Sequence, residues 1–166
     1  MNPNFERAFS ELIGIEGGYV NDPTDRGGET KYGISKRSYP HLDIKNLTLE
    51  KAKEIYYKDF WQVNGLDNIL KYEVAAELFD TGVNMGVGIA SRFLQEALNL
   101  MNRNGQNFQD LKVDGQIGPA TISAYRKVDD RILLKVLNGL QFSRYKSICE
   151  KKPSQEKYFN GWMKRV

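Results

Sequence analysis

The run from Glu16 to Ile34 limits the folds open to this chain more than any other segment. An apolar helical pattern leads directly into Glu16, and the pairs Gly17-Gly18 and Gly27-Gly28 then enclose a run that contains two aspartates. Glycine readily adopts the left-handed conformation that ends helices and forms tight turns. The segment therefore predicts a helix that stops at a glutamate, followed by turns that hold a second carboxylate, Asp25, over a cleft.

Apolar residues at helical spacing predict a mainly α fold. In the first segment Phe5, Ala8, Phe9, Leu12 and Ile13 fall on one face of a helix. The same pattern recurs along the chain, so we expect helices over residues 3–16, 48–60, 74–83, 89–101, 119–125, 132–140 and 153–163. The polar residues 102–118 are expected to form a loop.

A short strand is expected near the N-terminus. Thr30, Tyr32 and Ile34 alternate with Lys31 and Gly33, which predicts that the first three side chains share one face of a strand. We expect this strand to belong to one small β-hairpin beside the helices.

Length and charge fit a single globular domain. The chain has 166 residues, a net charge of +3 and one cysteine, Cys149, so it can bury a sizeable core but cannot form an internal disulfide. The positive charge is too small to indicate nucleic-acid binding, although it suits an anionic polymer such as a cell wall. We see no signal peptide and no apolar run that would span a membrane, and we expect synthesis in the cytoplasm.

The two carboxylates suit cleavage of a glycosidic bond. That reaction needs a protonated acid beside the leaving oxygen, and usually a second carboxylate that activates water or attacks the sugar. The negative end of the helix dipole should raise the pKa of Glu16. Asp25, nine residues later, could face it across the cleft, and the sequence leaves open whether the outcome is inverting or retaining.

Other chemistries have weaker support in the sequence. A zinc amidase needs a cluster of ligands, and His41 is the only histidine. A cysteine peptidase pair of Cys149 and His41 lacks a nucleophile motif, and a small buried side chain is the simpler interpretation of Cys149.

The run E-G-G-Y-V-x-D-P-x-D-x-G-G-x-T-x-x-G-I closely resembles glycoside hydrolase family 108, the N-acetylmuramidases of phage endolysins and prophages. Glu16 matches the catalytic glutamate of that family. The pattern is also similar to phage T4-type lysozymes, whose Glu, Asp and Thr are spaced E-x8-D-x5-T. Here Glu16, Asp25 and Thr30 give E-x8-D-x4-T, so the threonine sits one residue early.

Three further segments carry the resemblance. Residues 78–86 look like the family's helix-end segment, which implies that Asn84 lines the cleft. Residues 113–121 resemble the D-G-x-x-G-P-x-T element of peptidoglycan-binding segments, and residues 159–166 look like the C-terminal helix. We therefore expect one lysozyme-like domain over residues 1–166, with a catalytic segment of residues 1–90 and a peptidoglycan-binding-like helical segment of residues 91–166.

The resemblance implies a muramidase that cleaves the β-1,4 bond between N-acetylmuramic acid and N-acetylglucosamine without a cofactor. Glu16 would protonate the leaving oxygen, Asp25 would position water or stabilise charge, and Thr30 and Tyr32 would support the water or the sugar. The expected partners are peptidoglycan glycan strands, which the protein would reach after release from the cytoplasm through a phage holin or a dedicated export route. A lytic transglycosylase and a non-enzymatic protein for wall binding or secretion remain as alternatives.

Overall fold

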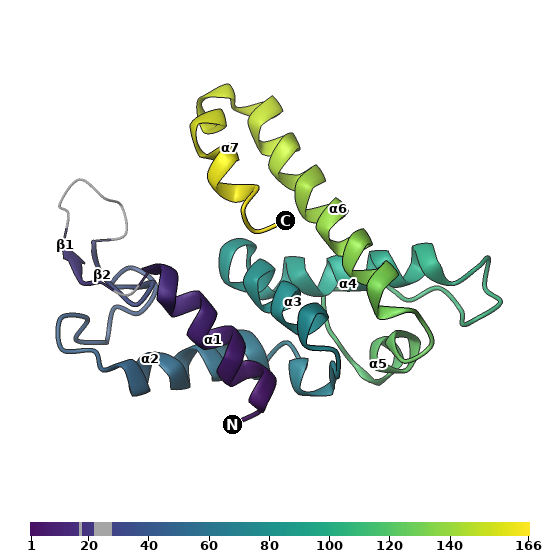
Figure 1. Cartoon of the computed structure of the whole chain (residues 1–166), viewed down its shortest axis with the longest axis horizontal. Helices are drawn as coiled ribbons and strands as arrows, with labels where there is room; N and C mark the ends of the chain where they lie inside the picture. The colour runs from purple at the N-terminus through teal and green to yellow at the C-terminus, as the bar shows by residue number, and fades with distance from the viewer. Residues whose placement is uncertain (17, 22–27) are drawn as a thin grey trace. The chain divides into compact units, whose positions relative to one another are not determined.

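The structure is a computed structural model that describes residues 1–16, 18–21 and 28–166, without the side chains of Ile15 and Glu16 (Figure 1). The chain divides into two compact units, Met1–Gln62 and Val63–Val166. The expected division into residues 1–90 and 91–166 stays a prediction. Within the described residues the fold is mainly α with one small sheet, as the sequence indicates.

The first unit combines helices with a small antiparallel sheet. Its elements are α1 (Pro3–Glu16), β1 (Val20–Asn21), β2 (Glu29–Lys31), β3 (Ile34–Ser35), α2 (Leu49–Tyr56) and the π-helix η1 (Tyr57–Gln62). The strands lie in the order β1-β2-β3. The side-chain oxygen of Asn2 accepts a hydrogen bond from the amide of Asn4 at 2.8 Å, and Thr48 caps α2 in the same way.

An aromatic cluster holds α1 against α2 and η1. The ring of Phe5 lies 4.9 Å from that of Tyr57 and 5.5 Å from that of Trp61, and Phe9 lies 5.7 Å from Tyr56. Phe5 and Trp61 are fully buried. Edge-on and tilted aromatic contacts of this kind add to the free energy gained from burial, so the helical face expected for residues 5–13 is confirmed at its buried positions.

The predicted single strand through Thr30, Tyr32 and Ile34 is wrong. Lys31 pairs with Ile34 across an antiparallel ladder, and the two residues between them, Tyr32 and Gly33, have φ values of 52° and 73°. Two successive positive φ values form the tight turn that matches the twist of a hairpin. The alternating pattern therefore contains a chain reversal, and the sheet has three strands because β1 also pairs with β2.

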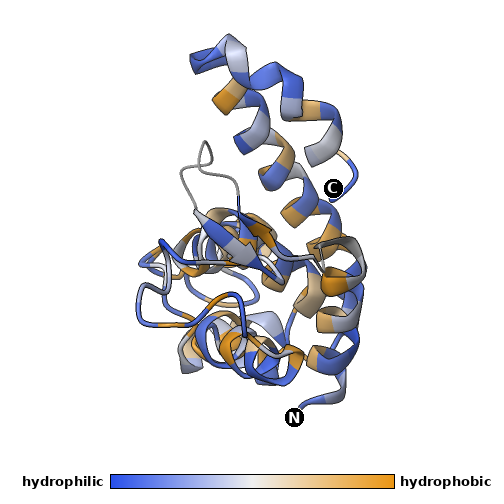
Figure 2. Ribbon diagram, turned by 90° about the vertical axis from the view of Figure 1, so that its left-hand side faces the viewer, coloured by the Kyte–Doolittle hydropathy of each residue, from blue (hydrophilic) through white to orange (hydrophobic). Residues whose placement is uncertain are grey.

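The second unit is helical. Its elements are η2 (Leu66–Asn68), α3 (Tyr72–Met85), α4 (Val87–Met101), α5 (Pro119–Tyr125), α6 (Asp130–Lys151), η3 (Pro153–Gln155) and α7 (Glu156–Trp162). Helix α3 packs on α4, α6 packs on both, and α7 returns along α6. Hydrophobic and hydrophilic residues are mixed along the helices (Figure 2), as expected where one face of each helix is buried.

The loop between α4 and α5 is held by side chains that replace backbone partners. Asn99 of α4 exchanges two hydrogen bonds with the backbone of Leu111, at 2.8 and 2.7 Å. Gln95, one turn earlier, donates to Asp114 and accepts from the amide of Gly115. These bonds satisfy polar groups that the loop would otherwise leave unpaired, so the loop expected over residues 102–118 has a fixed conformation.

Glu77 of α3 is a partly buried carboxyl group in the second unit. Burial is the main reason that its pKa rises to about 7, the charge of Asp80 raises it further, and a hydrogen bond from Thr81 opposes the rise. Thr81 in turn accepts a hydrogen bond from the amide of buried Gln141 at 3.1 Å. The neutral acid is thus favoured by folding at a pH where the unfolded chain carries a charge.

This environment makes stability depend on pH. The native state binds the proton more tightly than the unfolded chain, so stability falls as pH rises from about 4.5 to 7. The unfolding free energy of the wild type should fall between pH 5 and pH 8. We expect this fall to be smaller in Glu77→Gln by about 2–3 kcal/mol. Denaturant unfolding at both pH values measures this. The matched control is Glu73→Gln, an exposed change on the same helix, and an equal effect of both variants would contradict the assignment.

Candidate active site

Glu16 is the last residue of α1. The final turn, which reads Gly14-Ile15-Glu16, contains no basic residue, so the partial negative charge of the helix end is not balanced by a cation within that turn. The side chain of Glu16 and the whole of Asp25 lie outside the described residues. Their catalytic roles therefore stay predictions.

The sheet holds Thr30 opposite the chain that leaves α1. Strand β1 starts at Val20, four residues after Glu16, and Val20 pairs with Thr30. Four residues span at most about 14 Å, and paired Cα atoms of antiparallel strands lie about 5 Å apart. The Thr30 hydroxyl donates to the carbonyl of Gly28 at 3.4 Å, a long contact that a ligand or water could replace.

Glu29 is a carboxylate at this sheet that the sequence analysis did not single out. It precedes Thr30 on β2, pairs with Asn21 on β1, and accepts a hydrogen bond from the hydroxyl of Tyr19 at 2.9 Å. This hydrogen bond is the main reason that the pKa of Tyr19 is raised, so the phenol stays protonated. Its position follows from the pairing of β2 with β1, which the local sequence pattern does not reveal.

A hydrogen bond to its backbone carbonyl fixes the position of Tyr32. Its carbonyl accepts a hydrogen bond from the hydroxyl of Tyr56 at 3.0 Å, and its ring lies 5.4 Å from the ammonium group of Lys31. The side chain is half-buried. Tyr56 also contacts Phe9 of α1, so one buried tyrosine ties the hairpin turn to the helix that ends at Glu16.

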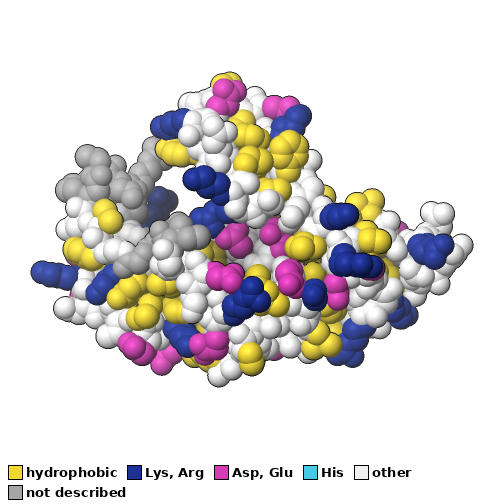
Figure 3. Space-filling view, in the orientation of Figure 1, with side chains coloured by type: hydrophobic (Ala, Val, Ile, Leu, Met, Phe, Trp, Pro, Cys, Tyr) yellow, Lys and Arg dark blue, Asp and Glu magenta, His cyan; other side chains and the backbone are white. Residues whose placement is uncertain are grey.

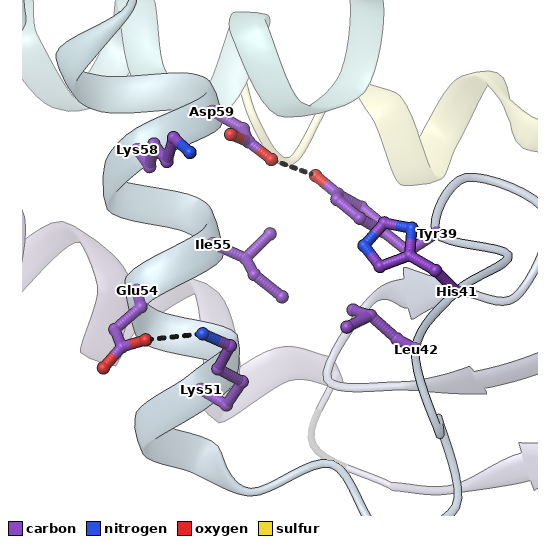
Figure 4. A pocket seen from close by; sticks show the side chains of 8 residues that line it. All are labelled: Tyr39, His41, Leu42, Lys51, Glu54, Ile55, Lys58 and Asp59. Carbon is purple, nitrogen blue, oxygen red and sulfur yellow. Dashed lines mark hydrogen bonds and ion pairs between the residues drawn. The ribbon is translucent and has the colours of Figure 1, made fainter.

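A pocket of about 360 Å³ lies elsewhere in the first unit (Figure 4). The segment Tyr39–Leu42 forms one wall, and a face of α2 and η1 forms the other. The lining residues are Tyr39, His41, Leu42, Lys51, Glu54, Ile55, Lys58 and Asp59. Thr30, Tyr32 and Asn84, the predicted site residues whose side chains the structure describes, are not among them.

The pocket offers several hydrogen-bonding groups. The hydroxyl of Tyr39 donates to Asp59 at 2.8 Å, and burial followed by this hydrogen bond raises the pKa of Tyr39 well above its usual range. The ring of His41 lies edge-on to Tyr39 at 6.3 Å, and Lys51 pairs with Glu54 at 2.9 Å. The phenol therefore remains a hydrogen-bond donor at neutral pH.

Asn84 belongs to the second unit, in the last turn of α3. Its side-chain amide donates to the carbonyl of Asp80 at 2.8 Å. The residue is exposed and lines a pocket of about 280 Å³ with residues from α3, α6 and α7, namely Met85, Arg144, Tyr145, Ile148 and Trp162. Its side chain is thus available to a ligand.

The described residues do not favour a metal site or a cysteine nucleophile. Among residues 1–16, 18–21 and 28–166, no group of three or more His, Cys, Asp or Glu side chains is arranged to hold a metal ion. Cys149 is a free, buried thiol of α6, and burial raises its pKa, which disfavours the thiolate that a cysteine nucleophile needs. In the part of the chain that the structure describes, no helix has the length and apolar character of a membrane span.

Known families cover the sequence in two adjoining parts. Residues 9–86 match the model of Glycosyl hydrolase 108, and residues 89–166 match that of a Predicted Peptidoglycan domain. The first match confirms the resemblance to glycoside hydrolase family 108 that the sequence indicates. The first model covers Glu16, Asn84 and Met85. The second model covers the remaining residues that line the Asn84 pocket, namely Arg144, Tyr145, Ile148 and Trp162.

A solved structure supports the same fold. The structure of Brucella abortus SagA is similar over 99% of this chain and 90% of that chain, with a TM-score of 0.77 and 25% sequence identity. No curated protein gives a significant match. The mainly α, lysozyme-like fold expected from the sequence is confirmed, and the chain is a glycoside hydrolase that acts on peptidoglycan.

Tyr56 gives a direct test of how the sheet is positioned. The replacement Tyr56→Phe keeps the buried ring but removes the hydrogen bond to the Tyr32 carbonyl, so we expect a loss of about 1 kcal/mol in unfolding free energy. We also expect wall hydrolysis to fall, because the turn that follows Thr30 loses an anchor. Chemical denaturation and turbidity assays measure the two effects. Tyr158→Phe, on an exposed residue of α7, is the control, and the positioning role is wrong if both variants behave alike.

Proposed function

We propose that this enzyme is an N-acetylmuramidase that hydrolyses the β-1,4 bond between N-acetylmuramic acid and N-acetylglucosamine. The observation that carries the proposal is the position of Glu16, which ends α1 in the segment that matches the model of Glycosyl hydrolase 108. A carboxyl group at the negative end of a helix keeps its proton to a higher pH than a solvated one. A protonated carboxyl group is what the leaving oxygen needs.

The remaining predicted residues have supporting roles in this proposal. Asp25 positions the attacking water or stabilises positive charge on the sugar. Thr30 and Tyr32 support the water or the sugar from the sheet, which is consistent with the weak 3.4 Å contact of the Thr30 hydroxyl. Glu29, beside Thr30, is a second carboxylate that could share the role of Asp25.

The proposed setting of the reaction is the cell wall after release of the enzyme from the cytoplasm. Release through a phage holin, or through a dedicated export route, would bring the enzyme to glycan strands. Enzyme activity found outside intact cells would favour dedicated export, whereas activity that appears only on lysis would favour the holin.

The first test replaces the proposed acid. Glu16→Gln preserves size and hydrogen bonding but cannot donate a proton to the leaving oxygen, so we expect lysis of purified wall to fall by a factor of at least about 10². Turbidity and release of soluble muropeptides measure the rate. Glu77→Gln is the matched control, because Glu77 has a raised pKa and lies on α3; it should retain the wild-type rate at pH 7. Wild-type lysis by Glu16→Gln would refute the assignment.

The second test identifies the reaction. Hydrolysis leaves a reducing N-acetylmuramic acid end, whereas a lytic transglycosylase leaves an anhydro sugar, and the two differ by one water in the mass spectrum of the digest. We expect reducing ends. We also expect Asp25→Asn to lower the rate, because hydrolysis has to activate water. Anhydro products together with a fully active Asp25→Asn variant would establish the transglycosylase, and wall binding without soluble products would establish a non-enzymatic role.

A further inference from the structure

The pocket beside Asn84 has a built aromatic wall. We call it the α6–α7 pocket, lined by Asn84, Met85, Arg144, Tyr145, Ile148 and Trp162. The rings of Tyr145 and Trp162 stack with centroids 4.8 Å apart and an interplanar angle of 15°. Tyr145 is buried and Trp162 is partly exposed. Tyr158 also lies against the Trp162 ring, with centroids 6.0 Å apart and an interplanar angle of 32°. The exposed part of this aromatic cluster suits the C–H face of a sugar ring, which is apolar while the ring edge is polar.

Polar groups of two kinds border this wall. Arg144 is exposed, and within the described residues it forms no hydrogen bond or ion pair. Its guanidinium fork matches a carboxylate. Asn84 donates its amide N–H to the Asp80 carbonyl, which leaves its Oδ1 to accept a hydrogen bond from an acetamido group. Hydrophobic and basic side chains also lie together over the part of Figure 3 where Figure 1 places α6 and α7.

Asp80 holds two walls of the pocket in place in the absence of ligand. The carboxylate of Asp80 pairs with Arg165 at 2.6 Å, and the backbone carbonyl of Asp80 holds Asn84. Arg165 follows Trp162 by three residues, and its amide donates to the Trp162 carbonyl at 3.0 Å. The end of α7 and the end of α3 are therefore tied to the same point, so little conformational entropy is lost when the pocket is filled.

We propose that the α6–α7 pocket is a binding site for peptidoglycan, separate from the bond that is cleaved. One sugar of the glycan strand stacks on Trp162, its acetamido group donates to Asn84, and a carboxylate of the attached stem peptide binds Arg144. Four of the six lining residues lie in the segment that matches a Predicted Peptidoglycan domain. The inference rests on the proposed function for the identity of the polymer and deepens it by assigning where the acidic peptide is held.

The test uses the full chain with Glu16→Gln, so that binding is measured without cleavage. The probe is an N-acetylglucosamine–N-acetylmuramic acid disaccharide that carries an L-Ala–D-Glu dipeptide with free carboxylates, and the uncharged probe is chitobiose. Calorimetry measures affinity. Tryptophan fluorescence reports the location, because Trp61 is fully buried and Trp162 is the partly exposed tryptophan.

We expect Arg144→Gln to weaken binding of the acidic probe about tenfold or more, and to leave chitobiose binding unchanged. Trp162→Leu should weaken both probes. The matched control is Lys135→Gln, which removes one exposed positive charge from the same helix, nine residues before Arg144, and should bind like the parent.

Three outcomes would overturn the proposal. They are equal affinity of Arg144→Gln and the parent, binding without a change in tryptophan fluorescence, and displacement of the probe by an equal concentration of inorganic phosphate, which would reveal an unselective anion site. If the α6–α7 pocket does not bind peptidoglycan, the wild type can still hydrolyse the wall. Failure of the proposed function appears instead as undiminished lysis by Glu16→Gln, so the two failures are distinguishable.

Discussion

The first unit depends on how Tyr56 is shared between the helices and the sheet. Its ring contacts Phe9 of α1, and its hydroxyl holds the Tyr32 carbonyl in the turn between β2 and β3. A buried hydroxyl has to be hydrogen-bonded, so the turn can take only one position against α1. The sheet that carries Thr30 and Glu29 is thereby fixed to the helix that ends at Glu16, and this link would give the proposed catalytic acid rigid support.

In the second unit an ion pair fixes neighbouring elements in a similar way. Asp80 binds Arg165 through its carboxylate and Asn84 through its carbonyl. The pKa of Glu77, three residues earlier, is raised to about 7 because burial and the charge of Asp80 disfavour ionisation. A second negative charge here would be costly. The unit thus combines one fixed ion pair with one proton-holding acid, and the pocket walls near Trp162 are set by the ion pair.

Periodicity predicted the helices well because each helix buries one face, as Phe5 and Phe9 do in α1. It failed at Tyr32, since alternation cannot distinguish a strand from a two-residue turn, and a tyrosine with positive φ is uncommon. Motif similarity selected Glu16 and the family, but a local pattern carries no information on contacts between distant residues. Glu29 was missed for that reason, and so was the association of Asn84 with Arg144 and Trp162, which lie 60 and 78 residues further along the chain.

In the proposed mechanism Glu16 retains its proton because it lies where α1 ends. An NMR titration of the Glu16 carboxyl carbon in the folded protein, assigned by comparison with Glu16→Gln, measures this property. We predict a pKa above the ordinary glutamate value of about 4.3, with the rate of wall hydrolysis falling as pH rises through the same pKa. A pKa at or below that ordinary value, or a hydrolysis rate that does not follow it, would rule out Glu16 as the proton donor.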